Sequence, residues 1–349
     1  MKAIVFHEHG DPSVLRYTEV AEPKIGPAEV LVRVRACALN HLDLWVRRGL
    51  PGISIPLPHI PGSDISGEVA RVGESVTRVK VGQRVLLAPG ISCGQCPQCL
   101  AGEDNLCRRY TLFGYMVDGG CAEYVKSPEV NVIPIPGDLS FEEAAAVPLV
   151  FLTAWQALTQ WGTPGAGAVL LVTGASGGVG VASVMLGKSL GLTVVGLSRS
   201  AAKGERLKEL GADFVFDPAD PALPKKVLAA VEPRKVDLAV DNVGGPAFNS
   251  LLMTLGYGGR VSVVGASGGP VPDFRTPLLF FKRNKIGGVA VGDYTAESAQ
   301  EAWAGIVARL NAMGRRPVID SVFAFEDVKK AFARLDEGPM GKVLVRIRS

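Results

Sequence analysis

The sequence is poor in histidine and has no long apolar run. It has four histidines: His7, His9, His41 and His59. They leave few imidazole groups for catalysis or for metal binding. A membrane-spanning helix needs about 18 consecutive apolar residues, and the longest candidate, 144–152, is shorter and contains Pro148. The first residues, MKAIVFHEHG, lack the architecture of a signal peptide. We therefore expect a cytoplasmic protein with no membrane partner.

No charge of either sign dominates the chain. Lysine and arginine number 37 against 34 for aspartate and glutamate, a formal net charge of +3. This balance excludes a strongly basic nucleic-acid-binding protein, so we expect no nucleic-acid partner. Hydrophobic residues make up 47% of the chain and charged residues 20%, which excludes global disorder. At 349 residues the chain is long for a single core, and we expect two domains.

The first 90 residues have the pattern of β-strands. Short β-branched runs alternate with Gly, Pro and Asp turn signals: AIVF, EVLVRVRA, ISGEVARVG and GQRVLLA. Because no strand–helix–strand alternation interrupts them, we expect an antiparallel or barrel-like unit. After a cysteine-rich loop, residues 140–162 predict a helical connection that begins with Ser140 as N-cap and is broken at Pro148.

From residue 168 the pattern changes to alternating strands and helices. AVLLVTG is a continuous apolar run, which is typical of a strand buried on both faces. Five more apolar strands follow: TVVGLS, DFVFD, VDLAVDNVG, GRVSVVGA and KIGGVAVG. This alternation predicts an α/β unit with a doubly wound parallel sheet. The tail resembles the first unit again, so we divide the chain into 1–150, 151–292 and a return to the first domain at 293–349.

Four cysteines have the spacing of a metal site. The pattern is C-x2-C-x2-C-x7-C, made by Cys93, Cys96, Cys99 and Cys107. Four thiolates saturate a tetrahedral Zn²⁺ ion and leave no open position, so the predicted zinc ion is structural, with one per chain. Two disulfides or an iron–sulfur cluster are the alternatives; the missing signal peptide disfavours the first, and the spacing disfavours the second. Cys37 and Cys121 are expected to pack as small buried hydrophobic residues.

A glycine-rich turn between a buried strand and a helix predicts a dinucleotide site. The sequence VTGASGGVG departs from strict G-x-G-x-x-G. Glycines let the backbone approach a pyrophosphate, which free N–H groups at the start of the helix then bind. The candidate contacts are Ala175, Ser176, Gly177, Gly178 and Val179. A tight turn without a ligand is the alternative interpretation.

The end of the next strand favours NADPH over NADH. Enzymes that use NAD place Asp or Glu about 20 residues after the glycine-rich turn, where it binds the ribose 2′-hydroxyl. Here Ser198 and Arg199 follow the strand, and the first carboxylate is Glu205, inside the next helix. Arg199 and Lys203 suit a 2′-phosphate, with Ser198 donating a hydrogen bond. Solvated cations at the start of a helix are the other interpretation.

These motifs resemble the medium-chain dehydrogenase/reductase superfamily over nearly the whole chain. The resemblance is carried by GPAEVLVRVRACALNHLDLW, PHIPGSDISGEVARVGESV, the four-cysteine loop, GGCAEYV, GASGGVG and GKVLV. It implies a GroES-like catalytic domain, a Rossmann domain that binds NADP, and a homodimer or homotetramer paired through the Rossmann domains. It also implies further cofactor contacts at His41, Asn242, Gly265, Ala266, Ser267 and Lys342; Asn242 is equally well explained as an ordinary turn residue.

The sequence departs from the zinc alcohol dehydrogenases of this superfamily at their catalytic metal. Their first ligand position is Asn40 here, in Asn-His-Leu-Asp43, and their GHE motif reads GSD at 62–64. The third position falls near Phe151, which cannot bind a metal. The resemblance is therefore to the quinone oxidoreductase and enoyl reductase branch, which acts without catalytic zinc. In that branch Asn40 and Asp43 would belong to the catalytic site, and Thr153 would lie beside the nicotinamide.

The resulting expectation is an NADPH-dependent enzyme that transfers hydride to a quinone, an enone or an enoyl thioester. Two other functions stay open at this point. One is a zinc-containing alcohol dehydrogenase with unusual ligands, which would hold two zinc ions per chain. The other is a non-enzymatic relative that binds NADPH without consuming it. The residues do not identify the proton donor or the physiological substrate.

Overall fold

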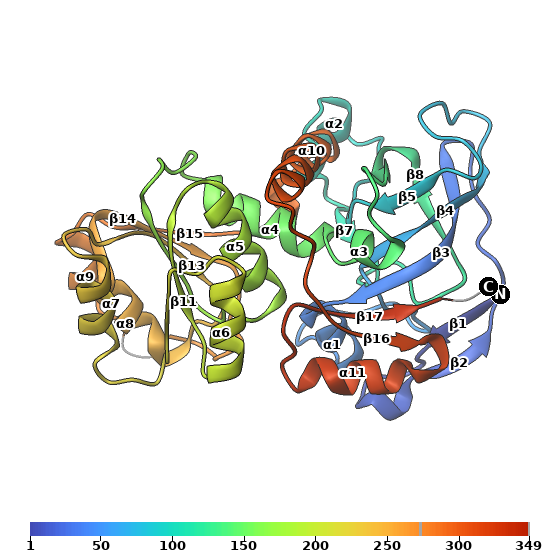
Figure 1. Ribbon diagram of the computed structural model, residues 1–349. Helices are drawn as coiled ribbons and strands as arrows, with labels where there is room; N and C mark the ends of the chain where they lie inside the picture. The colour runs from blue at the N-terminus through green and yellow to red at the C-terminus, as the bar shows by residue number, and fades with distance from the viewer. Residues whose placement is uncertain (272–273, 348–349) are drawn as a thin grey trace. The chain divides into compact units, whose positions relative to one another are not determined.

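The computed structural model describes residues 1–271 and 274–347, which pack into two compact units (Figure 1). Of the described residues, the first unit contains 1–149, 291–305 and 317–347; the second contains 150–271, 274–290 and 306–316. Helix α10 (Ala296–Ala312) begins in the first unit and ends in the second. The sequence pattern divides the chain near the same places, at residues 150 and 292, but does not separate 306–316.

One mostly antiparallel sheet forms the centre of the first unit. Its strand order is β16-β17-β3-β4-β5-β9, with β8 paired to β3, and only the β16–β17 pair is parallel. The β-rich first domain expected from the sequence is confirmed. The strands of this unit are β1 (Lys2–Val5), β2 (Arg16–Glu19), β3 (Glu29–Leu39), β4 (Asp64–Val72), β5 (Arg84–Leu87), β6 (Gly90–Ile91), β7 (Thr111–Leu112), β8 (Tyr124–Pro128), β9 (Val132–Pro134), β16 (Ile319–Ala324) and β17 (Lys342–Arg346).

The long strand β3 separates two layers of apolar side chains. Successive side chains of a strand point to opposite faces. Cys37 and Leu39 belong to the main core of the unit, whereas Ala36 and Ala38 pack with Leu344 and two alanines of the 141–146 segment. Asn40 follows the row of Ala36 and Ala38 by alternation. This second face is therefore the one on which polar residues at the strand ends can gather.

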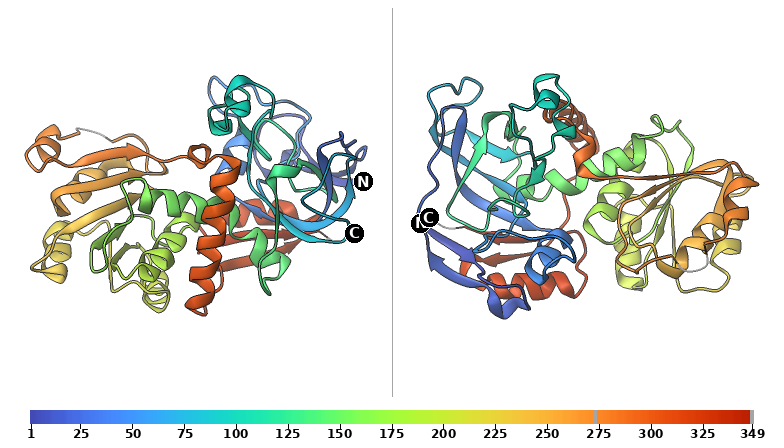
Figure 2. Two further views of the ribbon diagram at one scale, coloured as in Figure 1. Left: turned by 90° about the horizontal axis from the view of Figure 1, so that it is seen from above. Right: turned by 180° about the vertical axis from the view of Figure 1, so that it is seen from behind.

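Short helices also belong to this unit. They are α1 (His41–Arg48), α2 (Pro97–Leu100), α3 (Phe141–Ala145) and α11 (Val328–Asp336). The predicted N-cap is confirmed, because Ser140 Oγ accepts from the backbone N–H of Glu143 at 3.1 Å. The predicted break is confirmed as well: α3 ends before Pro148, and α4 (Pro148–Thr159) starts with it. Figures 1 and 2 show α11 alongside β16 and β17.

The second unit is the doubly wound α/β unit that the sequence predicts. All strands of its sheet run parallel in the order β12-β11-β10-β13-β14-β15, the arrangement of dinucleotide-binding folds. Helices α5 and α6 cover one face, and α7, α8 and α9 the other (Figure 1). The elements are β10 (Val169–Val172), α5 (Gly178–Ser189), β11 (Thr193–Leu197), α6 (Ala201–Glu209), β12 (Phe214–Phe216), α7 (Leu223–Val231), β13 (Val236–Asp241), α8 (Phe248–Thr254), β14 (Leu255–Val263), α9 (Thr276–Phe280) and β15 (Lys285–Gly288).

The sequence pattern did not predict α10 or β16. Both belong to the segment that follows the last strand of the parallel sheet, where we expected only a return to the first domain. Across residues 1–271 and 274–347, no helix combines the length and the apolar character needed to cross a membrane.

Candidate functional site

Asn40 lies at the junction of β3 and α1, where its backbone is fixed by Asp43. The carboxylate of Asp43 accepts from the backbone N–H of Asn40 at 2.7 Å and from that of Gly62 at 2.8 Å. Asp43 is completely buried, and desolvation raises its pKa to about 7, although the two backbone N–H groups favour the charged form. Through these contacts Asp43 fixes the backbone at Asn40 and at Gly62. Its predicted catalytic role stays a prediction.

The side chain of Asn40 belongs to a buried polar cluster with Asp64 and Lys342. Asn40 Nδ2 donates to Asp64 Oδ2 at 3.0 Å, and Lys342 Nζ donates to Asn40 Oδ1 at 2.5 Å. Lys342 Nζ also forms an ion pair with Asp64 Oδ2 at 2.9 Å. The predicted cofactor contact of Lys342 stays a prediction; the structure shows its ammonium group bound to protein atoms. The residue that sequence reasoning left without a role is Asp64.

His41 was expected as a further cofactor contact, and Thr153 as a neighbour of the nicotinamide. His41 is the first residue of α1 and is exposed, and desolvation together with the positive charge of Lys342 lowers its pKa. Thr153 is buried within α4, in the second unit. The predicted roles of both residues stay predictions.

The glycine-rich turn connects β10 to α5 in the second unit. A Cβ atom at Gly180 would lie 2.3 Å from the carbonyl oxygen of Gly174, so only glycine lets the helix start this close to the turn. Gly177 is the N-cap of α5, no side chain caps the helix, and its first turn has no acidic residue. The backbone N–H groups near Gly178 and Val179 therefore stay available for an anion, which fits a pyrophosphate.

Ser198 and Arg199 follow β11, as the sequence predicts. Ser198 Oγ lies 3.2 Å from the carbonyl oxygen of Ser200, and Ser200 Oγ accepts from the backbone N–H of Lys203 at 3.4 Å as the N-cap of α6. Arg199 is exposed. This strand end presents cationic side chains and hydroxyl groups, a donor set that fits a phosphate group.

The ends of β13 and β14 meet the glycine-rich turn at the carboxyl edge of the sheet. Asn242 Nδ2 donates to the carbonyl oxygen of Thr173 at 2.8 Å, while its Oδ1 is buried without a hydrogen-bond partner in the described part of the chain. A Cβ atom at Gly265 would lie 2.8 Å from the carbonyl oxygen of Asn242, and Ser267 Oγ lies 3.3 Å from that oxygen, beside Ala266. The structure thus brings these predicted residues together at the edge where such sheets bind their ligands.

Asp241 organises this edge and was not singled out from the sequence. Its Oδ1 accepts from Thr173 Oγ1 at 2.6 Å, and its Oδ2 accepts from the backbone N–H of Gly244 at 3.0 Å. The signal that could have identified it is its position at the end of the strand VDLAVD, where a carboxylate follows the apolar run LAV.

The four predicted cysteine ligands lie in one cluster. Their Sγ atoms are all within 4.8 Å of one another, and all four are free thiols. The backbone N–H groups of Cys93 and Arg109 point to the sulfur of Cys107 at 3.4 and 3.3 Å. The backbone N–H of Gln95 lowers the pKa of Cys93 to about 5, which favours the thiolate. This donor set fits a structural zinc ion with no open position.

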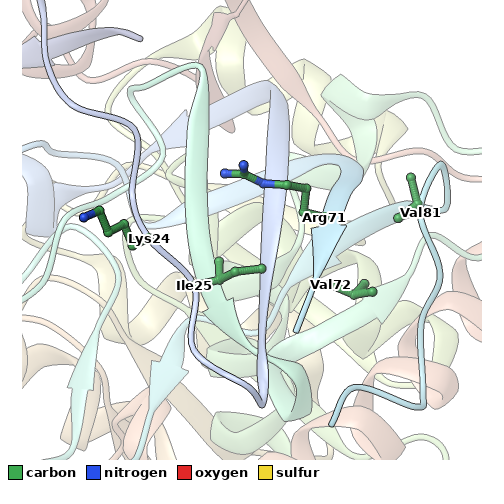
Figure 3. A pocket seen from close by; sticks show the side chains of 5 residues that line it. All are labelled: Lys24, Ile25, Arg71, Val72 and Val81. Carbon is green, nitrogen blue, oxygen red and sulfur yellow. The ribbon is translucent and has the colours of Figure 1, made fainter. Parts of the chain in front are cut away.

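A separate open pocket lies on the surface of the first unit. Its volume is about 510 Å³, and Figure 3 shows the residues that line it: Lys24, Ile25, Arg71, Val72 and Val81. Arg71 forms an ion pair with Glu22. None of the predicted site residues lines this pocket, so we do not assign it to the candidate site.

Comparison with known proteins places the chain in a family. Residues 26–137 match the alcohol dehydrogenase GroES-like domain, and 178–311 match the zinc-binding dehydrogenase domain. An alcohol dehydrogenase of Geobacillus stearothermophilus is 35% identical over 353 residues, covering 99% of this chain and 100% of that one. A quinone oxidoreductase of Lama guanicoe is 30% identical over 351 residues, covering 100% and 98%. The crystal structure of an NAD-dependent alcohol dehydrogenase matches with a TM-score of 0.92 and 38% identity over the full length of both chains. The chain therefore belongs to the medium-chain dehydrogenase/reductase superfamily of oxidoreductases.

Proposed function

We propose that this protein is an NADPH-dependent oxidoreductase that transfers hydride to a quinone or to an α,β-unsaturated carbonyl compound, without a catalytic zinc ion. The observation that carries the proposal is the orientation of the Asn40 amide. An ammonium group only donates hydrogen bonds and a carboxylate only accepts them. The bonds to Lys342 and Asp64 therefore fix which end of the amide is the oxygen and which is the nitrogen.

This orientation leaves Asn40 with one N–H group to offer. The Nδ2 atom carries two hydrogens, and its bond to Asp64 uses one of them. The second can donate to an oxygen atom that becomes negatively charged during a reaction. A donor held in place before the reaction stabilises such an oxygen without reorganisation, and this effect is worth about 10²- to 10³-fold in rate for a single donor.

Conjugated acceptors suit this arrangement better than simple alcohols. Oxidation of an alcohol needs a group that lowers the pKa of the hydroxyl, which zinc does as a Lewis acid. Reduction of an enone instead moves negative charge onto a carbonyl oxygen, where the N–H group of Asn40 can stabilise it. NADPH, when bound, supplies the hydride, and a proton completes the reduction. A quinone accepts hydride in the same way, because negative charge again develops on a carbonyl oxygen.

The metal-binding residues of the chain also favour this reaction. Among the described residues, the four cysteines are the one group of three or more His, Cys, Asp or Glu side chains placed to share a metal ion. Asn40, Ser63 and Phe151 stand where the zinc alcohol dehydrogenases place catalytic ligands, and none of them is a good zinc ligand.

Binding of the dinucleotide is assigned to the second unit. The uncapped start of α5 suits the pyrophosphate, and the unpartnered Oδ1 of Asn242 offers an acceptor at the same edge of the sheet. Ser198, Arg199 and Lys203 support NADPH over NADH, because a 2′-phosphate requires cations where NAD enzymes have a carboxylate.

An alcohol dehydrogenase is the second candidate. The observation in its favour is that the relatives with 35% and 38% identity carry that name. The two candidates differ in their metal content, because an alcohol dehydrogenase of the zinc type would hold two zinc ions per chain and the proposed reductase would hold one.

A screen for NADPH oxidation with quinones, enones and enoyl thioesters tests the proposal. We expect activity with at least one of these classes, unaffected by brief treatment with a chelator. Asn40→Ala should lower kcat about 10²- to 10³-fold and leave the KM for NADPH almost unchanged, because the amide acts on the substrate oxygen. Robust oxidation of ethanol or benzyl alcohol with NADP⁺, abolished by the chelator, would instead support the alcohol dehydrogenase.

A further inference from the structure

Lys342 donates more hydrogen bonds than an ion pair requires. Its Nζ atom lies 2.9 Å from the carbonyl oxygen of Leu39, 2.5 Å from Asn40 Oδ1 and 2.9 Å from Asp64 Oδ2. An ammonium group has three donors, and these three acceptors use all of them. The side chain is 3% exposed, so the charge is held away from water. Burial of an ammonium group costs several kcal/mol unless its partners are well placed.

The sheet brings these partners together from distant parts of the sequence. β3 ends at Leu39, β4 begins at Asp64 and β17 begins at Lys342. The register pairs Leu39 with Val343 and Ala38 with Asp64, so the three strand ends meet at one edge. The second oxygen of Asp64 is also fixed, because it accepts from the backbone N–H of Leu149 at 2.8 Å. Neither of the two side-chain partners of Lys342 can turn away without losing another bond.

The ammonium group acts on the amide in two ways. Its bond to Oδ1 holds the amide in the orientation that leaves one N–H group to offer. It also draws electron density toward Oδ1, and hydrogen bonds in a chain strengthen one another in this way. The Nδ2–H group of Asn40 thereby becomes a stronger donor. A structural ion pair between Lys342 and Asp64 alone would give neither effect.

We propose that Lys342 is a positioning residue for hydride transfer: it orients and polarises the Asn40 amide, so that a buried positive charge supports the oxygen of the acceptor through the amide. This inference rests on the proposed function. It predicts that the increase in kcat contributed by Lys342 requires Asn40. It also predicts that this increase is larger for an acceptor whose oxygen carries more of the negative charge in the transition state. An enone should therefore depend on Lys342 more than a quinone does.

A double-mutant cycle on the full chain tests this dependence. Lys342→Met should lower kcat with an enone about 10- to 100-fold, the range expected when a supporting residue no longer holds a catalytic group in place. The KM for NADPH should stay within about twofold, because a loss in kcat alone indicates an interaction made in the transition state. In the Asn40→Ala background the same substitution should have almost no further effect on kcat, because the two residues act as a unit.

Lys282→Met is the matched control. Lys282 is a partly buried lysine, and its Nζ donates to the carbonyl oxygens of Met253 and Leu255 at 3.1 and 2.7 Å in the second unit. Its removal should lower the melting temperature without changing the enone-to-quinone ratio. Where Lys342→Met fails to fold, the cycle is repeated with Lys342→Gln, which keeps most of the side-chain volume and removes the charge.

The outcomes separate this inference from the proposed function. A wild-type protein that reduces no acceptor with NADPH overturns the proposed function and the inference together. A wild-type protein that is active, with losses from Lys342→Met and Asn40→Ala that multiply, overturns the inference alone. Equal losses of kcat with an enone and with a quinone in Lys342→Met would also overturn the inference alone. The Asn40 side-chain amide resonances offer a readout independent of turnover, since they should shift in Lys342→Met and stay in place in Lys282→Met.

Discussion

The carboxylate of Asp43 accepts a hydrogen bond from the backbone N–H of Gly62, with 2.8 Å between Oδ1 and the nitrogen atom. The same carboxylate accepts from the backbone of Asn40. One buried group thus joins the start of α1 to the loop that leads into β4. The loop leads directly to Asp64 and the helix start carries Asn40, so the positions of these two residues depend on this carboxylate.

The first prediction concerns the pH dependence of stability. Because burial raises the pKa of Asp43 to about 7, the folded protein binds this proton more tightly than the unfolded chain. Its contribution to the free energy of unfolding is therefore complete below 3.8, the ordinary pKa of an aspartate side chain, and is lost as the pH rises through about 7. In this window the free energy of unfolding falls with rising pH, with a slope that approaches about 1.4 kcal/mol per pH unit for one group.

Asp43→Asn should remove this slope. Urea unfolding of both proteins between pH 4.5 and pH 7.5 (roughly the window that the two pKa values bound) measures the difference between the two slopes. Other titrating groups cancel in that difference. Parallel curves for the two proteins would contradict the assignment.

The second prediction concerns the cysteine cluster. We expect one zinc ion per chain by elemental analysis, lost in Cys107→Ser and retained in Cys121→Ala, which alters a buried cysteine outside the cluster. Loss of the metal should lower the melting temperature by at least about 2–4 °C, the equivalent of roughly 1 kcal/mol in a domain of this size. A protein without zinc, or with these thiols paired as disulfides, would contradict this prediction.

Loss of zinc should also loosen the backbone at the start of α10. Asp104 lies between the third and fourth cysteines, and its two carboxylate oxygens lie 3.2 and 3.3 Å from the backbone N–H of Ala296. Once the loop is no longer held by metal, this contact weakens. Amide hydrogen exchange should therefore accelerate around Ala296 in the metal-free protein, and an unchanged rate there would show that the contact does not depend on the metal.

The third prediction concerns the homo-oligomer. β15 is an edge strand of the parallel sheet, and the same unit exposes large apolar side chains at Tyr257, Phe280 and Phe281. Among the described residues no further strand pairs with this edge, and an open edge in a unit that exposes aromatic residues is suited to pairing with a second copy. Light scattering should give a mass of two or four chains, and Phe281→Lys should reduce it. Leu100→Lys, at an exposed apolar residue of α2, is the control and should leave the mass unchanged.

Patterns within short segments predicted most of the fold. The alternation of strands and helices after residue 168 depends on local hydrophobic periods, so it predicted the parallel sheet correctly. The cysteine cluster was predicted for the same reason, because its four ligands occur within 15 residues. Helix α10 was not predicted, although it has a local N-cap, because Thr295 Oγ1 accepts from the backbone N–H of Ser298 at 3.1 Å. The contact between Asp104 and the backbone N–H of Ala296 joins residues far apart in the sequence, and no local pattern reveals it.

The candidate site was predicted only in part. Asn40 and Asp43 could be found from their motif, but the partner that orients Asn40 is Lys342, 302 residues away. The pairing of Lys342 with Asp64 depends on the register of β3 with both β4 and β17, which no local pattern reveals. The resemblance implies a cofactor contact for Lys342, which stays a prediction; the structure adds the place of Lys342 in a polar cluster at the strand ends.

The last prediction concerns the choice of cofactor. Arg199 is exposed after β11, where a 2′-phosphate is expected, and the chain has no carboxylate there before Glu205. Arg199→Ala should raise the KM for NADPH by about 10- to 150-fold, because hydrogen bonds to a charged group are worth ~1.5–3 kcal/mol. The KM for NADH should hardly change, since NADH has no phosphate at this position. Steady-state kinetics with both cofactors measure the two effects.

Arg206→Ala provides the control for this prediction. Arg206 lies on α6, the helix that follows Arg199, and forms an ion pair with Glu209 three residues away. Exposed pairs of this kind contribute at most about 1 kcal/mol, so the substitution should change neither KM by more than a small factor. If Arg199→Ala raises the KM for NADPH and the KM for NADH equally, Arg199 supports the fold of this loop and does not bind the 2′-phosphate. If the wild-type protein uses NADH better than NADPH, the assignment of the cofactor is wrong, and the uncapped start of α5 then binds the pyrophosphate of NADH.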